Sequence, residues 1–256
     1  AGPNVGFGMD IAVRGNLALI SRVDNSQRTA ALHTYRFDGD QWQHVDTADL
    51  APLVATFSFM YGVEISFVHD GVVVGLSGFS TSEQTPSHEI RVFGLSSDGL
   101  FAGWDTLTAP NPSAWRGYGP TIAADGDWVA VHDSYGVVTD TQVRAVTSVF
   151  RRNGSGWVRL WDIPSPVAQP IGACGIGATI ISGGLAVLGD RMYVGVGGGE
   201  LAPGTLRGAS IDSYDLNPSM IPQHVDSMPA TSLELLARAG RVALFKDGGL
   251  SFFDPT

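Results

Sequence analysis

The stretch "FGMDIAVRGNLALIS", residues 7–21, decides the fold because it has the pattern of two β-strands joined by a tight turn. Apolar residues alternate along the first run, and a more continuous apolar run follows Gly15 and Asn16. Gly followed by Asn or Asp suits a hairpin turn, because these residue types tolerate positive φ angles. Aliphatic runs of this length are typical of strands. The stretch therefore predicts a β-hairpin.

Four later stretches align with this hairpin without a gap. They begin at residues 61, 118, 181 and 232 and are "YGVEISFVHDGVVVG", "YGPTIAADGDWVAVH", "ISGGLAVLGDRMYVG" and "SLELLARAGRVALFK". The fifth position is Ile or Leu in every copy, and the sixth is Ala or Ser. Recurrence at intervals of 51 to 63 residues indicates a repeat protein.

Each hairpin is followed by a third strand candidate, and four of the five units then offer a candidate for a fourth. Four-stranded antiparallel units repeated around an axis are the blades of a β-propeller. We therefore predict an all-β fold, a five-bladed β-propeller of four-stranded antiparallel blades in a single domain. The predicted domain covers residues 1–256, with blades at 6–50, 58–108, 117–165, 178–227 and 230–256. A β-sandwich of hairpins is the rival, and it gives no reason for five copies in register.

The closure of the predicted ring is open at this stage. The fifth unit offers no fourth apolar run after its third strand, and only "AGPNV" precedes Phe7. The last blade therefore has either three strands or a looser pairing than the other four.

Composition excludes several classes of partner. The 256 residues are 44% hydrophobic and 16% charged, and the formal net charge is −10. A chain this acidic has no basic footprint for nucleic acid, and it disfavours anionic membranes. No apolar run reaches the length of a membrane span, so we expect no membrane insertion. Cys174 is the single cysteine, so no internal disulfide forms, and the oligomeric state is open.

The repeat resembles the FG-GAP family of propeller repeats, in its bacterial variety and with degenerate copies. The matching Phe-Gly or Tyr-Gly steps and Gly-Asp turns are Phe7-Gly8, Tyr61-Gly62, Tyr118-Gly119, Gly126-Asp127 and Gly189-Asp190. The resemblance implies adhesion or ligand recognition, often of carbohydrate, and an extracellular or periplasmic location. The Asp-x-Asp-x-Asp-Gly calcium loop of integrin-type members is absent. We therefore expect no cofactor or metal, although calcium stays possible by analogy with the family.

Topology places the candidate ligand-binding residues on one face. In such a blade, the loops from the second to the third strand and from the fourth strand to the next blade open on the same side. These loops are long here, notably at residues 77–88, and long loops on a rigid scaffold carry binding sites. The ligand-binding candidates are Trp115, Arg116, Tyr118, His132, Asp133, Arg22 and Asp24. Exposed Trp and Tyr stack on sugar rings and Arg donates to hydroxyls, while packing between blades is the alternative for the aromatic residues.

Three further tryptophans recur at one repeat position, at the predicted fourth strand, and they are Trp42, Trp104 and Trp157. Recurrence favours packing at the outer strand of a blade, so we expect them to pack there without a ligand.

The sequence supports three functions to different extents. The leading prediction is a secreted or surface-exposed carbohydrate-binding module with no catalytic residues. A glycoside hydrolase or lyase is the alternative, with Asp10 and Glu64 as axial carboxylates. The structural explanation, which we favour, is that both carboxylates are solvated or accept hydrogen bonds from backbone donors. A protein-interaction scaffold or inhibitor is the second alternative, and a large exposed apolar patch would favour it.

Overall fold

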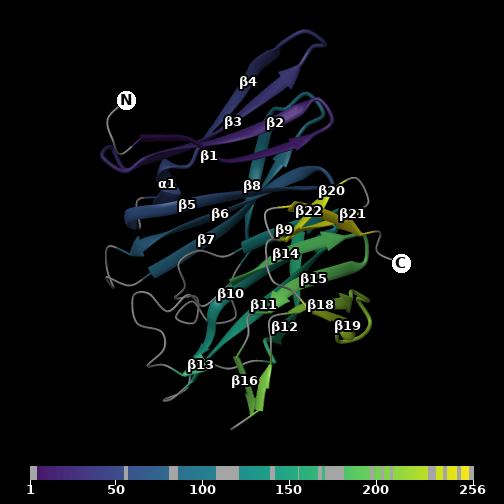
Figure 1. Cartoon of the computed structure of the whole chain (residues 1–256). Helices are drawn as coiled ribbons and strands as arrows, with labels where there is room; N and C mark the ends of the chain where they lie inside the picture. Colours follow the sequence, from purple (N-terminus) through teal and green to yellow (C-terminus); the bar gives the residue numbers. More distant parts are fainter. Residues whose placement is uncertain are drawn as a thin grey trace. The chain divides into compact units, whose positions relative to one another are not determined.

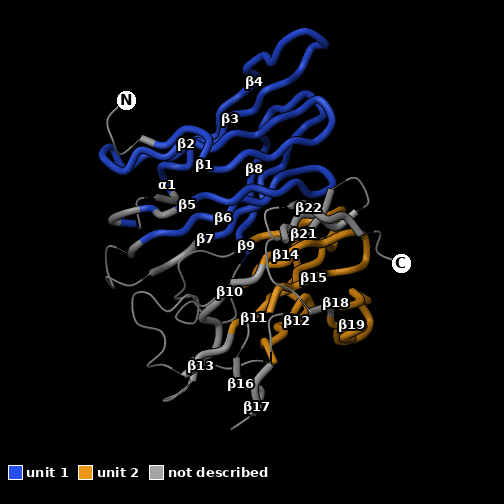
Figure 2. Tube along the Cα trace, in the orientation of Figure 1, with its two compact units in different colours: residues 1–108, 118–120 blue, residues 109–117, 121–256 orange. Residues whose placement is uncertain are grey.

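The computed structural model describes most of the chain, and it divides into two compact units (Figures 1 and 2). Unit 1 comprises residues 1–108 and 118–120, and unit 2 comprises residues 109–117 and 121–256. The residues described are 5–54, 57–80, 86–107, 121–138, 142–154, 156–166, 169–170, 182–196, 199–202, 205–207, 210–229, 235–238, 241–246 and 249–253.

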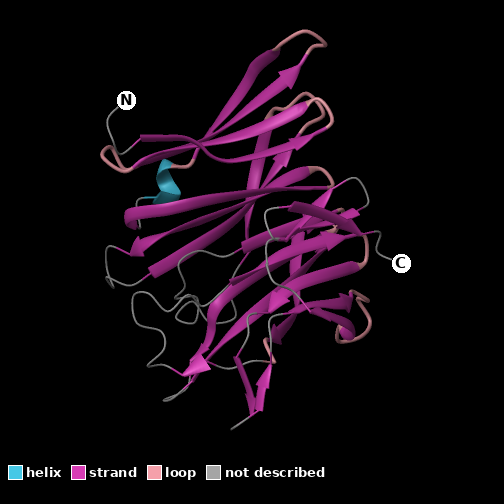
Figure 3. Ribbon diagram, in the orientation of Figure 1, coloured by secondary structure: helices cyan, strands magenta, loops and turns pink. Residues whose placement is uncertain are grey.

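Almost all of the regular structure described is β-strand (Figure 3). Unit 1 contains two four-stranded antiparallel sheets, each with its strands in sequence order. The first consists of β1 (Val5–Arg14), β2 (Leu17–Asp24), β3 (Thr29–Phe37) and β4 (Trp42–Asp49). The second consists of β5 (Phe57–Val68), β6 (Gly71–Ser80), β7 (Pro86–Leu95) and β8 (Phe101–Leu107). A short helix, α1 (Ala51–Val54), lies between β4 and β5 in the chain.

The two sheets of unit 1 share one hydrophobic core. Its members come from the second and third strands of the first sheet and from β5 to β7 of the second, and they include Leu17, Leu19, Leu32, Val63, Ile65, Val74, Leu76 and Phe93. These are the aliphatic runs that the repeat pattern assigns to buried strands. Burial of this apolar surface holds the two sheets face to face.

Unit 2 contains two further four-stranded antiparallel sheets and one of three strands. The strands of the first are β9 (Thr121–Asp125), β10 (Trp128–Val138), β11 (Gln142–Asn153) and β12 (Gly156–Pro164), and β13 (Gln169–Pro170) also pairs with β11. Those of the second are β14 (Ser182–Leu188), β15 (Arg191–Val196), β18 (Ser210–Asp215) and β19 (Gln223–Pro229). The third sheet consists of β20 (Leu235–Arg238), β21 (Arg241–Lys246) and β22 (Gly249–Phe253). A small hairpin of β16 (Gly199–Ala202) and β17 (Thr205–Arg207) precedes β18.

The prediction of repeated hairpins is confirmed. The predicted pairs form as β1 with β2, β5 with β6, β9 with β10, β14 with β15, and β20 with β21. Gly15, Gly126 and Gly189 adopt positive φ angles at three of these turns, as the Gly-Asn and Gly-Asp steps require. The architecture is therefore all-β, with meander sheets of the kind found in propeller blades.

The prediction of five four-stranded blades is wrong. The described residues form four such sheets, and the fifth repeat unit forms a sheet of three strands that no other part of the described chain completes. The physical reason is already in the sequence, because that unit has no fourth apolar run to supply a strand. The described sheets are thus not a ring of five equivalent blades. The assignment of residues 1–256 to a single domain stays a prediction.

Every four-stranded sheet has a β-bulge at the same place, between its third and fourth strands. One extra residue of the fourth strand interrupts the register in each case, and these residues are Val45, Gly103, Leu160 and Val225. A bulge bends the strand and changes the direction of nearby side chains. The bulge therefore gives a structural register for comparing the four sheets.

The connections between second and third strands are shorter than the sequence predicted. β6 continues to Ser80 and β7 begins at Pro86, within the stretch 77–88 that was expected to be a long loop. The hairpin of β16 and β17 likewise occupies part of the fourth unit's connection. Much of the predicted loop-rich face is thus strand, because hydrogen-bonded pairing extends past the apolar runs that marked the strands in the sequence.

The first strand of the chain differs from its repeat equivalents in exposure. Ile65, Ile122 and Leu185, at the fifth repeat position, are all buried. At the same position on β1, Ile11 is 55% exposed. The other large apolar residues of this strand, Phe7, Met9 and Val13, are exposed as well.

Candidate functional site

The bulge of β8 opens a pocket in unit 1. Its extra residue, Gly103, has a φ of +45°, and a Cβ atom added to it would meet nothing within 4 Å. The other three sheets have an aliphatic side chain at this bulge. Glycine therefore relieves the backbone of strain at this φ, and it contributes to the pocket lining without a side chain.

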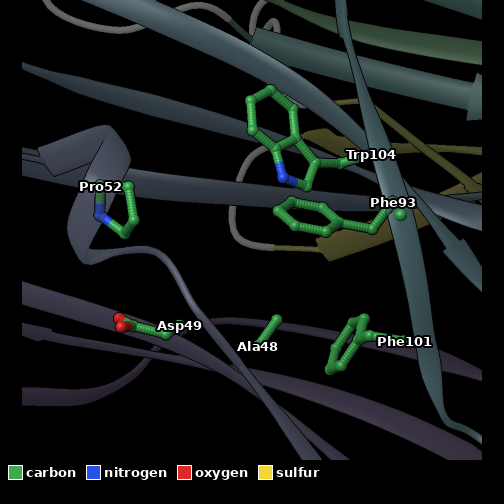
Figure 4. A pocket seen from close by; sticks show the side chains of 7 residues that line it. Ala48, Asp49, Pro52, Phe93, Phe101 and Trp104 are labelled. Carbon is green, nitrogen blue, oxygen red and sulfur yellow. The ribbon is translucent and has the colours of Figure 1, made fainter.

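The pocket has a volume of about 230 Å³ (Figure 4). Its lining comes from β4, α1, β7 and β8, and consists of Ala48, Asp49, Pro52, Phe93, Phe101, Gly103 and Trp104. Pockets for drug-sized ligands measure about 300–1,000 Å³, so this one suits a smaller group such as a single ring. Figure 4 shows Trp104, Phe93 and Phe101 on one side and Pro52 and Asp49 on the other.

The aromatic side of the pocket is built by strand pairing. Phe93 of β7 lies directly opposite Trp104 of β8, so their side chains project from the same face of the sheet. Phe93 is buried and packs edge-on against Phe101, with ring centroids 6.0 Å apart. Trp104 is 53% exposed. A buried aromatic base thus supports an indole that still has surface to offer a ligand.

The guanidinium of Arg91 lies over the ring of Trp104. The Arg91 guanidinium carbon lies 4.0 Å from the centroid of the Trp104 ring, and the guanidinium forms an ion pair with Glu89. Such a cation–π contact favours one orientation of the indole. Trp104 is therefore positioned before any ligand arrives.

The single charged residue of the lining is Asp49, at the end of β4. Its Oδ1 accepts a hydrogen bond of 2.8 Å from the backbone N–H of Ala51, at the start of α1. The neighbouring carboxylate, Asp46, fixes the distance between the two sheets, because its Oδ2 accepts a hydrogen bond of 3.0 Å from the Phe101 N–H. The polar and aromatic sides of the pocket are thus tied to each other through β4 and β8.

The structure corrects the expected equivalence of three tryptophans. Counted from the bulge, Trp42 and Trp157 both lie three residues before the extra residue, whereas Trp104 follows it directly. The counterparts of Trp104 are Trp161 and, in the remaining sheets, Asp46 and Asp226. Trp104 is therefore not a repeat of the other two, and the expectation that all three share one repeat position is wrong.

Two predicted ligand-binding residues, Arg22 and Asp24, lie on β2 of unit 1. Arg22 is exposed, whereas Asp24 is buried. The Asp24 Oδ1 atom accepts hydrogen bonds from the Ser26 hydroxyl and from the backbone N–H groups of Ser26 and Gln27. These hydrogen bonds lower the pKa of Asp24, and the bond from the Ser26 hydroxyl has the largest effect. The carboxylate stabilises the turn between β2 and β3, which is the common role of Asp in this setting.

His132 and Asp133 lie on β10 of unit 2, and both are buried. The His132 Nδ1 atom is 2.9 Å from the Thr147 hydroxyl. Burial lowers the pKa of the imidazole to about 4, against a smaller opposing effect of Asp133. The sequence placed both residues at the end of this strand, but β10 continues beyond them to Val138. The remaining candidates, Trp115, Arg116 and Tyr118, lie outside the described residues.

The axial carboxylates of the hydrolase alternative lie in unit 1. Asp10 is largely buried and accepts hydrogen bonds from two backbone N–H groups, of Ile11 at 2.8 Å and of Ile65 at 2.6 Å. Burial raises the pKa of Asp10, and the two hydrogen bonds oppose that shift. Glu64, on β5, is partly buried. Asp10 thus links β1 to β5 by accepting hydrogen bonds from backbone N–H groups. This is the structural role that the sequence analysis gave as the alternative to catalysis.

A serine, a histidine and an aspartate meet on β18 and β19 of unit 2. The Ser227 hydroxyl donates to Asp212 Oδ1 at 2.9 Å and lies 2.8 Å from His224 Nε2. In a hydrolytic triad the serine donates to the histidine instead, and the carboxylate orients the histidine. Unit 1 has Thr47 at the equivalent place, 2.9 Å from ring nitrogens of two histidines. This recurrence beside the bulge indicates that the cluster stabilises the pairing of the third and fourth strands.

The described residues contain no group of three or more His, Cys, Asp or Glu side chains arranged to hold a metal ion. Within the same part of the chain, no helix has the length and apolarity needed to cross a membrane.

Comparisons with known proteins give no family. No family model matches the chain, and no curated protein matches it. Among solved structures, the chain is similar to one from a structural and mechanistic study of two prolyl endopeptidases, with a TM-score of 0.48 and 15% sequence identity. The match covers 97% of this chain and 33% of the endopeptidase chain. A hypothetical selenium-binding protein from Sulfolobus tokodaii has a TM-score of 0.33 and 7% identity, with coverage of 84% and 60%. The chain thus spans about a third of the first structure's length, and neither similarity carries an argument about function.

Proposed function

We propose that the protein is a carbohydrate-binding module, secreted or surface-exposed and of the FG-GAP type, and that the pocket at Trp104 is its binding site. One observation carries the proposal. A half-exposed indole, fixed by Arg91 and supported by Phe93, shares a small pocket with the carboxylate of Asp49.

The chemistry of the pocket matches that of a sugar ring. The C–H face of a pyranose packs on an aromatic ring, and Trp104 offers such a surface. The hydroxyls of the sugar need acceptors, and the Asp49 carboxylate is one. The volume of about 230 Å³ accommodates one ring at a time, as at the end of a glycan or along its length.

Binding without catalysis accounts better for the carboxylates than glycoside hydrolysis does. A glycosidase requires two carboxyl groups that face a common cleft. Asp10 accepts two backbone hydrogen bonds between β1 and β5, and the Trp104 pocket has a single carboxylate in its lining. We therefore propose recognition of a glycan, with no reaction and no metal or other cofactor.

A glycan array followed by calorimetric titration tests the proposal. Loss of the indole in Trp104→Ala should remove about 1–2 kcal/mol of binding free energy, a fall of roughly five- to thirtyfold in affinity. Trp42→Ala is the matched control, because Trp42 is also about half exposed and lies in unit 1, outside the pocket. An array without selective binding, or equal losses in both variants, would refute the proposal.

A protein-interaction role is the second candidate, and the exposed face of β1 favours it. Four apolar side chains lie exposed along this strand, and they are Phe7, Met9, Ile11 and Val13. Contiguous exposed apolar surface marks interaction sites. Under this hypothesis, Ile11→Asp abolishes association with a partner or a second copy while sugar affinity is unchanged. Sedimentation that gives the same mass for wild type and variant at every concentration would contradict it.

A further inference from the structure

We infer that the pocket at Trp104 selects a sugar that carries a free ammonium group, with Asp49 as its counter-ion. The inference rests on the proposed function and names the class of its ligand, which is an amino sugar rather than a neutral or acidic one.

The first step is the state of the Asp49 carboxylate. Its Oδ1 accepts the hydrogen bond from Ala51, whereas its Oδ2 accepts none from any described residue. No cation pairs with it in the same part of the chain, although Arg91 lies near the pocket. Arg91 is instead bound to Glu89 and stacked on Trp104. Among the residues that the structure describes, none pairs with the negative charge that Asp49 brings to the pocket.

The second step is the character of the other walls. Aromatic rings attract cations through the negative potential of their faces, and three aromatic side chains line the pocket, Trp104, Phe93 and Phe101. None of the described residues in the lining is basic. The formal net charge of −10 adds a long-range attraction for cations. All three contributions favour a cationic ligand over a neutral one and disfavour an anionic one.

The third step is the size of the expected preference. Asp49 is exposed, so its ion pair with a ligand is weakened by solvent, and the gain over a neutral hydroxyl is modest. The cation–π contribution adds to that gain. We expect an amino sugar to bind about three- to tenfold more tightly than its neutral counterpart, and the preference to shrink in 1 M salt because salt screens exposed charges.

The test is a set of calorimetric titrations of the full chain with glucosamine, glucose, N-acetylglucosamine and glucuronate. The expected order of affinity is glucosamine first, glucose and N-acetylglucosamine next, and glucuronate last. Asp49→Asn should make glucosamine and glucose bind with equal affinity, because the amide carries no charge, and Asn keeps an acceptor for the Ala51 N–H. A thermal unfolding curve of the variant checks that the fold is retained.

Asp105→Asn is the control variant. Asp105 follows Trp104 on β8, is exposed, and does not line the pocket, so this change alters the net charge equally without touching the site. The control should keep the full preference for glucosamine. Equal affinities for glucosamine and glucose would overturn the inference while leaving the proposed function intact, whereas no binding of any sugar would overturn both. Binding of lysine amide as tight as that of glucosamine would also overturn it, because the ammonium group alone would then be recognised.

Discussion

A pair of matched alanine substitutions tests whether burial in unit 1 is as the structure describes it. Ile11 and Ile65 occupy the same repeat position, on β1 and β5, but Ile11 is 55% exposed and Ile65 is 8% exposed. Ile65 belongs to the core shared by the two sheets, together with Leu17 and Leu19. The two residues thus differ in environment while their chemistry and place in the strand are the same.

The magnitudes follow from these exposures. Truncation of a buried isoleucine to alanine costs about 2–5 kcal/mol, from lost burial and from the cavity that remains. Ile65→Ala should fall in that range. Ile11 has less than half of its surface out of contact with water, and its truncation leaves no enclosed cavity, so Ile11→Ala should cost about 1 kcal/mol or less.

Urea denaturation followed by circular dichroism measures both values in the same transition, because both residues belong to unit 1. The expected result is a difference of at least about 1 kcal/mol in the free energy of unfolding between the two variants. Equal costs would refute the reasoning, since they would mean that the face of β1 is covered in solution.

Three further predictions concern pH, a buried carboxylate and the pocket. The pKa of His132 is lowered to about 4 by burial, so the stability from its neutral form is complete above about pH 6.5 and is lost as the pH falls toward 4. Denaturation across this range should show a loss of up to about 3 kcal/mol, which His132→Gln abolishes. Asp10→Ala leaves the Ile65 N–H without its acceptor and should cost about 1–3 kcal/mol of stability, measured by urea denaturation, with no change in sugar affinity. Asn tolerates a positive φ, so Gly103→Asn should keep the fold while adding a side chain to the lining of the pocket, and titration should show at least a tenfold loss of sugar affinity. Gly154→Asn, at a similar φ in a turn outside the pocket, should show no loss.

The strands were predictable because their signal is local. Each hairpin consists of two apolar runs around a turn, and this pattern needs no knowledge of what the strands pack against. The number of complete sheets was overestimated because symmetry was extended to the fifth unit, where the residues supply three strands. The extensions of β6, β7 and β10 were missed for a related reason, since backbone pairing continued where the apolar pattern had stopped.

The site was harder to predict, because it depends on a bulge and on packing between two sheets. Counted from the extra residues Val45 and Gly103, Trp104 lies four positions after the equivalent of Trp42, and an alignment by tryptophan alone conceals this offset. The sequence did contain a signal for the position of the bulge. Nearly identical stretches, "QHVDT" at residues 43–47 and "QHVDS" at residues 223–227, span the bulge in two of the units. The meeting of Asp49 with Trp104 had no local signal, since it arises only when β4 and β8 come together.

A nuclear magnetic resonance titration of the full chain with a sugar, observed at the indole N–H groups, tests whether Trp104 binds the ligand. We expect the Trp104 signal to shift with saturation while that of Trp42 does not, and the shift to disappear in Gly103→Asn. Saturating shifts confined to other tryptophans, with Trp104 unaffected, would contradict it.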